Sequence, residues 1–178
     1  METSAVYWEP KIKIYGFQET VDLSLIELTL KAEQINSWGF YVNELDDRGI
    51  NFNLALVQWS DKNKLRLCLI FHRKWERRII DHIQKKIKAD AGEYFRVESP
   101  VELIYFQGPH FGDRYGIADS ALKILTDNNI TILASGCSGS AIYLVLPGKS
   151  IKKAGQLLMS AFEVPQTANF PEHSITHD

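Results

Sequence analysis

The sequence has little of what disulfide-stabilised, membrane-spanning or nucleic-acid-binding proteins need. Its 178 residues include only two cysteines, Cys68 and Cys137, which is too few for a disulfide framework. No apolar run approaches the roughly 18 residues of a membrane span, and residues 1–4 do not resemble the start of a signal peptide. The 20 basic and 22 acidic residues leave a net charge of −2, which gives no support for general nucleic-acid binding. These absences predict a cytoplasmic protein.

Residues suited to catalysis or metal binding are also scarce. Ser135 and Ser138 have no histidine and aspartate partners at a recognisable spacing, so nucleophilic catalysis has no support. His173 and His177 are four residues apart, which would place both on one face of a helix. They lie in a polar segment with no third ligand nearby. The residues therefore give no support for nucleophilic catalysis, and we expect no cofactor and no metal.

What the sequence does contain is one order of apolar patterns that occurs twice. In the first half, period-2 and period-3.6 patterns predict a strand over 12–17, a helix over 23–35, strands near 50–59 and 65–71, a helix over 75–87 and a strand over 94–97. In the second half they predict a strand over 101–107, a helix over 117–127, strands near 130–135 and 141–146, and a helix over 150–162 capped by Ser150. Completed by a final strand, each half is the split βαβ arrangement of ferredoxin-like folds. The prediction is an α+β protein with two βαββαβ units, antiparallel sheets and helices on one face.

The second unit has no obvious final strand of its own. Residues 165–171 contain two prolines, which suit a sheet edge or a tail. The strand-like residues Ala5–Trp8 are predicted to cross over and fill the gap. The expected domains are 9–99 and 100–164, the latter completed by strand 5–8, with 165–178 as a polar tail.

The segment Gly108–Ile117 is the most informative part of the chain. A strand pattern runs into it, a helix pattern leaves it, and Gly112 and Gly116 enclose Asp113 and Arg114. A helix start carries unpaired backbone N–H groups and a favourable dipole for an anion, while Asp113 offers the opposite charge. Such a site suits the carboxylate and ammonium of a free amino acid. The alternative is a strand–helix turn whose glycines only provide positive φ.

These residues resemble a known family. The turn Gly112–Ala118, the segment Asn128–Ile132, the Ser135–Ser138 stretch and a last helix ending at Phe162 resemble tandem ACT domains, in particular the C-terminal regulatory pair of aspartokinases. Tyr115 stands where the family usually has proline. In that family a segment before the first ACT strand completes the second sheet, which matches the place of 5–8. A phosphate-binding loop for a kinase is not found in the sequence, so the resemblance implies a regulatory module that is not an enzyme.

The first half resembles the family less. Its expected strand–helix loop, Gly16–Asp22, has a single glycine and carries Glu19 and Asp22, which would oppose an anion. The polar segment Gly39–Gly49 also departs from the compact family pattern. Ligand binding is therefore assigned to the second half.

The resemblance implies a free-standing regulatory module that binds a free amino acid at ACT interfaces, forms a homodimer and signals to a separate enzyme of amino-acid metabolism. Backbone N–H groups at Tyr115, Gly116 and Ile117 would hold the carboxylate, with Arg114 in the same turn. Asp113 would hold the ammonium. The facing strand would supply Asn129, Ile130 and Thr131, from the same or a neighbouring unit. The main alternative is an ACT-like assembly protein without a ligand. RNA binding through the basic residues around Trp75 and the strand aromatics is a remote one.

Overall fold

The structure is a computed structural model that describes residues 11–87, 94–109, 111–112 and 115–164. In chain order its elements are β1 (Ile12–Lys13), β2 (Gly16–Lys31), α1 (Ile35–Asp46), β3 (Phe52–Asp61), β4 (Lys64–His72), α2 (Glu76–Gln84), β5 (Tyr94–Gln107), α3 (Ile117–Asp127), β6 (Ala134–Cys137), β7 (Ala141–Pro147), α4 (Ile151–Ala161) and β8 (Phe162–Glu163). Short 3₁₀ turns, Ala32–Gln34 and Arg73–Trp75, precede α1 and α2.

Two long strands, β2 and β5, form the middle of one six-stranded sheet with the order β3-β4-β2-β5-β7-β6. Their neighbours are all antiparallel. Residues 23–31 of β2 pair with β4 and with the start of β5, whereas residues 16–20 pair with the end of β5. The orders β3-β4-β2-β5 and β6-β7-β5-β2 are therefore two ferredoxin-like sheets that share two strands. The predicted α+β fold is confirmed.

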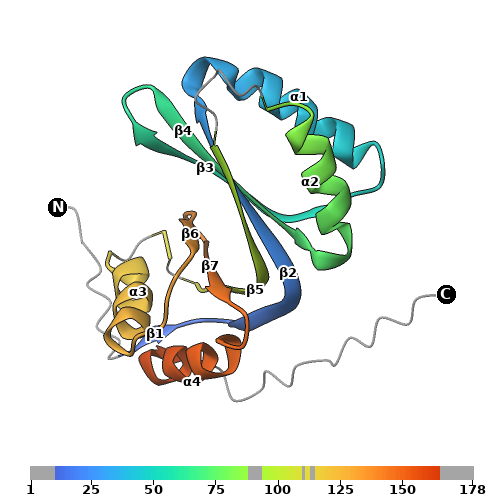
Figure 1. Ribbon diagram of the computed structural model, residues 1–178. Helices are drawn as coiled ribbons and strands as arrows, with labels where there is room; N and C mark the ends of the chain where they lie inside the picture. The colour runs from blue at the N-terminus through green and yellow to red at the C-terminus, as the bar shows by residue number, and fades with distance from the viewer. Residues whose placement is uncertain (1–10, 88–93, 110, 113–114, 165–178) are drawn as a thin grey trace.

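Each half of the sheet carries its own pair of helices (Figure 1). Helices α1 and α2 bury Trp38, Leu45 and Ile79 against the β2 and β4 side chains of the first half. Helices α3 and α4 bury Leu125 and Leu158 against β5 and β7 in the second half. The prediction of helices on one face holds for each half.

The faces that the helices leave uncovered pack against each other. A third cluster joins Leu25 and Ile70 of the first half to Leu103 and Val145 of the second. The outermost strands also meet, since Gln58 on β3 donates a 3.1 Å hydrogen bond to the carbonyl of Ser135 on β6. The sheet thus folds back on itself, and the two halves have a common apolar interior.

The last strand of the second half comes from the N-terminal part of β2. Gly16–Thr20 lies beside β5, with Phe17 opposite Phe106. The predicted crossing strand Ala5–Trp8 lies outside the described residues, and this position beside β5 is taken by Gly16–Thr20. Two residues of β1 also pair in parallel with β8, so the end of α4 is tied to the same N-terminal segment.

The prediction of a helix over 23–35 is wrong. Residues 16–31 are strand throughout, and the helix begins only at Ile35. The apolar residues alternate over Val21–Leu25 and again over Ile26–Leu30, but the alternation changes phase between Leu25 and Ile26. Leu25 faces the interior between the halves, whereas Ile26 and Leu28 face the helices. Because of this change of phase, Leu25, Leu28, Ala32 and Ile35 also fit a helical period, which explains the wrong prediction. The expected loop Gly16–Asp22 lies in this strand, and most of the segment Gly39–Gly49 is α1.

Other strand boundaries and one helix cap also differ from the prediction. The expected strands 94–97 and 101–107 are one strand, β5, in which Pro100 lies where the register with β2 skips, between Glu98 and Val101. A residue without N–H is tolerated at such an irregularity. Strand β6 begins at Ala134 rather than at residue 130. Ser150 occupies the N-cap of α4 but makes no capping bond with its side chain.

Helix α4 is capped instead from a distant strand. One carboxylate oxygen of the buried Glu102 on β5 accepts hydrogen bonds from the backbone N–H groups of Ser150, at 2.9 Å, and Ile151, at 2.7 Å. A carboxylate at a helix N-terminus satisfies two unpaired donors and is stabilised by the helix dipole. The cap therefore fixes α4 to the shared strand.

A histidine between α1 and α2 predicts pH-dependent stability. The His82 ring is 6 % exposed, and its Nε2 lies 3.3 Å from the Tyr41 carbonyl oxygen and 3.3 Å from Glu44 Oε2. Burial is the main cause that lowers the pKa of His82, and the positive charge of Arg48 lowers it further. The hydrogen bond with the Tyr41 carbonyl and the negative charge of Glu44 raise the pKa, but by less. The His82 ring binds a proton more readily in the unfolded chain than in the folded one. The contribution of the neutral ring to folding stability is therefore complete above the unfolded pKa of about 6.5, and it is lost as the pH falls through the pKa of the folded state.

We therefore expect His82→Gln to lose less stability than the wild type between about pH 7 and pH 5. Glu44 does not titrate in this window, because its hydrogen bond with Lys86 lowers the pKa of its carboxyl group. Urea unfolding midpoints of both proteins at several pH values measure the difference. Equal pH slopes for the two proteins would contradict the assignment.

Candidate functional site

The predicted amino-acid site lies at the start of α3. Gly116 is the N-cap of this helix and has a φ of 83°, which a residue without a side chain adopts at no steric cost. Gly116 has no side chain that could accept a hydrogen bond from the first-turn N–H groups of α3, and no side-chain cap is found among the described residues. Ile117 is buried and anchors the helix, whereas Tyr115 is fully exposed. Asp113 and Arg114 lie outside the described residues.

The facing residues Asn129, Ile130 and Thr131 lie at the other end of the same helix. The N–H of Asn129 donates to the Thr126 carbonyl and that of Ile130 to the Leu125 carbonyl. With Asn129 at a φ of 58°, these bonds make a Schellman-type helix end. The 11 residues of α3 separate this end from Gly116 by about 16 Å. One chain does not bring the two predicted groups together, so a site that uses both needs a second copy.

The equivalent junction in the first half offers no similar opening. Strand β2 passes into α1 through Lys31–Gln34, which contains no glycine. The Gln34 side-chain oxygen accepts a 2.7 Å hydrogen bond from the backbone N–H of Lys31. A local side chain thus already serves as acceptor at this helix start.

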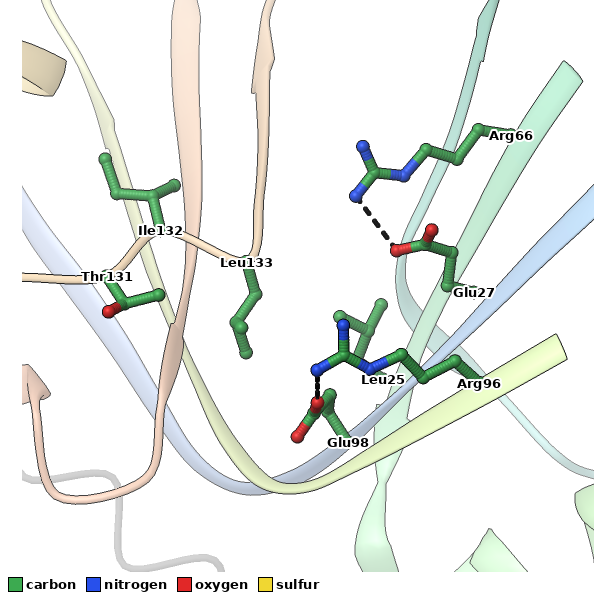
Figure 2. Close-up of a pocket in the computed structure, with 8 residues that line it drawn as sticks. All are labelled: Leu25, Glu27, Arg66, Arg96, Glu98, Thr131, Ile132 and Leu133. Carbon is green, nitrogen blue, oxygen red and sulfur yellow. Dashed lines mark hydrogen bonds and ion pairs between the residues drawn. The ribbon is translucent and has the colours of Figure 1, made fainter. Parts of the chain in front are cut away.

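A cavity of about 310 Å³ that the sequence did not predict lies between the two halves of the sheet. Figure 2 shows two arginine–glutamate pairs from β2, β4 and β5 facing the segment that leads into β6. The lining residues are Leu25, Glu27, Arg66, Arg96, Glu98, Thr131, Ile132 and Leu133. Thr131, expected to face the α3 site, lines this cavity. The alternation of Arg96, Val97 and Glu98 indicates a charged strand face. Its partner strand β2 was predicted as a helix over 23–35, so the pairing of the two strands did not follow from the sequence.

Electrostatics in the cavity are internally balanced. Arg66 Nη2 lies 2.9 Å from Glu27 Oε2, and this hydrogen bond is the main cause that raises the pKa of Arg66. Arg96 pairs in the same way with Glu98. Cys68, the neighbour of Glu27 across the strands, is a buried free thiol whose pKa burial raises. A thiol of this kind is poorly nucleophilic.

Other site types are not found in the described ranges. Within the residues that the structure describes, no group of three or more histidine, cysteine, aspartate or glutamate side chains is arranged to hold a metal ion. The predicted pair His173 and His177 lies outside these residues. Among the described helices none is both long and apolar enough to cross a membrane.

Comparison with known proteins finds similarity in structure only. No family model matches the sequence, and no curated protein matches it. The regulatory subunit of aspartate kinase from Thermus flavus is similar with a TM-score of 0.73 and 14% identity, over 85% of this chain and 99% of that one. Aspartate kinase from Synechocystis is similar with a TM-score of 0.77 and 16% identity, over 93% of this chain and 30% of that one.

A third similar structure is E. coli aspartokinase III in complex with lysine and aspartate, with a TM-score of 0.56 and 17% identity, over 88% of this chain and 35% of that one. Against the full-length kinases the chain spans about a third of their length, whereas it matches nearly all of the separate regulatory subunit. The chain therefore has the paired ACT fold of aspartate kinase regulatory subunits.

Proposed function

We propose that this chain is a regulatory module without catalytic activity that binds a free amino acid at the start of α3. The observation that carries the proposal is the α3 N-terminus, where the N-cap residue Gly116 has no side chain to accept hydrogen bonds from the first-turn N–H groups. The likeness to a separate aspartate kinase regulatory subunit supports the regulatory part. The structure of E. coli aspartokinase III with lysine and aspartate supports an amino acid as the ligand class.

The chemistry is sufficient for a metabolite sensor. The helix dipole contributes roughly 0.3–1 kcal/mol to the binding of a carboxylate, and each charge-assisted hydrogen bond adds about 1.5–3 kcal/mol. These contributions correspond to a Kd between about 1 mM and 1 μM. In the proposal Asp113 holds the ammonium and Arg114 lies in the same turn.

The site is proposed to be completed by a second copy of the chain. Because Asn129–Thr131 and Gly116 lie at opposite ends of α3, a homodimer would supply the missing half from the partner. A separate catalytic subunit or another enzyme of amino-acid metabolism would receive the signal. A ligand-free assembly protein is the second candidate, favoured by the outermost strand β3, on which Val57 and Trp59 are exposed.

The binding prediction is tested by calorimetry with each of the twenty amino acids. We expect one or a few to bind the wild type, and Asp113→Ala to weaken that binding by roughly tenfold or more, the loss of one charge-assisted bond. Asp81→Ala, an exposed change on α2, is the matched control and should bind as the wild type does. If no amino acid binds at millimolar concentration, the assembly function replaces the sensing function.

A further inference from the structure

The cavity between the two sheet halves has one charged wall and one mostly apolar wall. The charged wall is formed by Glu27, Arg66, Arg96 and Glu98 on three adjacent strands of the first half. Opposite them, Thr131–Leu133 runs from the end of α3 toward β6 (Figure 2). Leu25, 2 % exposed, also lines the cavity and belongs to the apolar interior between the halves. The volume of about 310 Å³ is at the small end of ligand sites.

The charges that line the cavity sum to zero, but each ion pair leaves hydrogen-bonding groups that a ligand could use. Two arginines face two glutamates, so the lining has no net charge. Each pair uses one guanidinium nitrogen and one carboxylate oxygen, Arg66 Nη2 with Glu27 Oε2 and Arg96 Nη2 with Glu98 Oε1. A guanidinium has five N–H donors and a carboxylate two acceptor oxygens. Arg66 Nε is buried and has no hydrogen-bond partner among the described residues.

A ligand for this wall needs both signs of charge. A simple anion would meet Glu27 and Glu98, and a simple cation would meet Arg66 and Arg96, so neither gains from the whole set. A zwitterion can place its carboxylate on the guanidinium groups and its ammonium on the carboxylates. The ion pairs it would rearrange have side chains between 21% and 56% exposed, and exposed pairs contribute little to stability.

We propose that this cavity binds one free amino acid of zero net charge with an aliphatic side chain. Its carboxylate would lie on Arg66 and Arg96, its ammonium on Glu27 and Glu98, and its side chain against Leu25, Ile132 and Leu133. A charged side chain would bring an additional charge into a lining that is already neutral and is rejected. This site is separate from the start of α3, and because it joins the two halves, its ligand would stabilise their contact.

The test uses the full chain and calorimetry with L-leucine as the probe. We expect L-leucine to bind, with N-acetyl-L-leucine and L-leucinamide at least tenfold weaker, because each lacks one of the two charges. L-Lysine and L-aspartate should also bind this cavity at least tenfold more weakly. Arg66→Gln and Glu98→Gln should each weaken L-leucine tenfold or more, whereas Arg78→Gln, an exposed change on α2, should have no effect.

The outcomes separate this site from the proposed α3 site. L-Leucine binding that Asp113→Ala preserves and Glu98→Gln removes supports the cavity. L-Leucine binding that Asp113→Ala removes and both cavity variants preserve overturns it while the proposed function stands. Absence of L-leucine binding at millimolar concentration, or equal binding of L-leucinamide and N-acetyl-L-leucine, also overturns it. The last comparison uses only the wild type, so it decides even if a cavity variant does not fold.

Discussion

Removal of residues 1–20 is expected to unfold the second half of the protein. The deletion takes away the strand segment Gly16–Thr20 that pairs with the end of β5. It also removes Ile14 and Phe17, which are 0% and 4% exposed in the core beneath α3 and α4. Burial of two such side chains is worth roughly 3–6 kcal/mol, a large part of the 5–15 kcal/mol that typically stabilises a domain. The bared edge of β5 would in addition invite aggregation.

A chain that begins at residue 11 is the matched control. It keeps β1 and all of β2, so its urea midpoint should be close to that of the full-length chain, while the chain that begins at residue 21 should show an early transition or form aggregates in light scattering. The same pair of deletions decides which segment crosses over. Equal damage from both would favour the sequence prediction of Ala5–Trp8 over Gly16–Thr20.

Phe106→Ala is expected to destabilise the protein by about 3–5 kcal/mol, the range for large aromatic-to-alanine changes in a core. The Phe106 ring is 0% exposed. Its centroid lies 5.1 Å from that of Phe17, 6.0 Å from that of Phe111 and 5.2 Å from that of Phe162. The substitution therefore opens a cavity where the crossing strand, the α3 loop and the end of α4 meet.

Urea unfolding followed by circular dichroism measures this loss. Met159→Ala is the control, because that side chain on α4 is 52% exposed and its removal should change stability by no more than about 0.5 kcal/mol. A loss below about 1 kcal/mol for Phe106→Ala would mean that the aromatic cluster repacks, since well-packed cores usually collapse only in part.

The two helices of the second half were predictable almost to the residue. Helices α3 and α4 begin and end within one residue of the expected bounds, since each has a single apolar stripe and flanking turn residues. The first half was not, because the alternation of apolar residues in β2 changes phase between Leu25 and Ile26, so that the same residues also fit a helical period. The same error placed the strand–helix junction at Gly16–Asp22 instead of Lys31–Gln34.

The candidate sites divide in a similar way. A turn whose glycines provide positive φ was the alternative to a ligand site before α3, and Gly116 has this conformation. The resemblance implies that Asn129–Thr131 belong to the same site, from the same or a neighbouring unit. Within one chain, the 11 residues of α3 separate them from Gly116. The cavity between the halves was not foreseen, because Glu27 and Arg66 are 39 residues apart in the chain.

By itself the sequence determined the α+β class, the repeated order of elements in the second half and the glycine turn before α3. These features depend on side-chain periodicity and on backbone preferences, and both are set by residues close together in the sequence. Only the tertiary structure decided that β2 and β5 are shared by both sheets, that Gly16–Thr20 is the crossing strand and that two charged pairs face Thr131–Leu133. Those features arise from pairing between distant segments, and the period of a strand is the same whichever partner lies beside it.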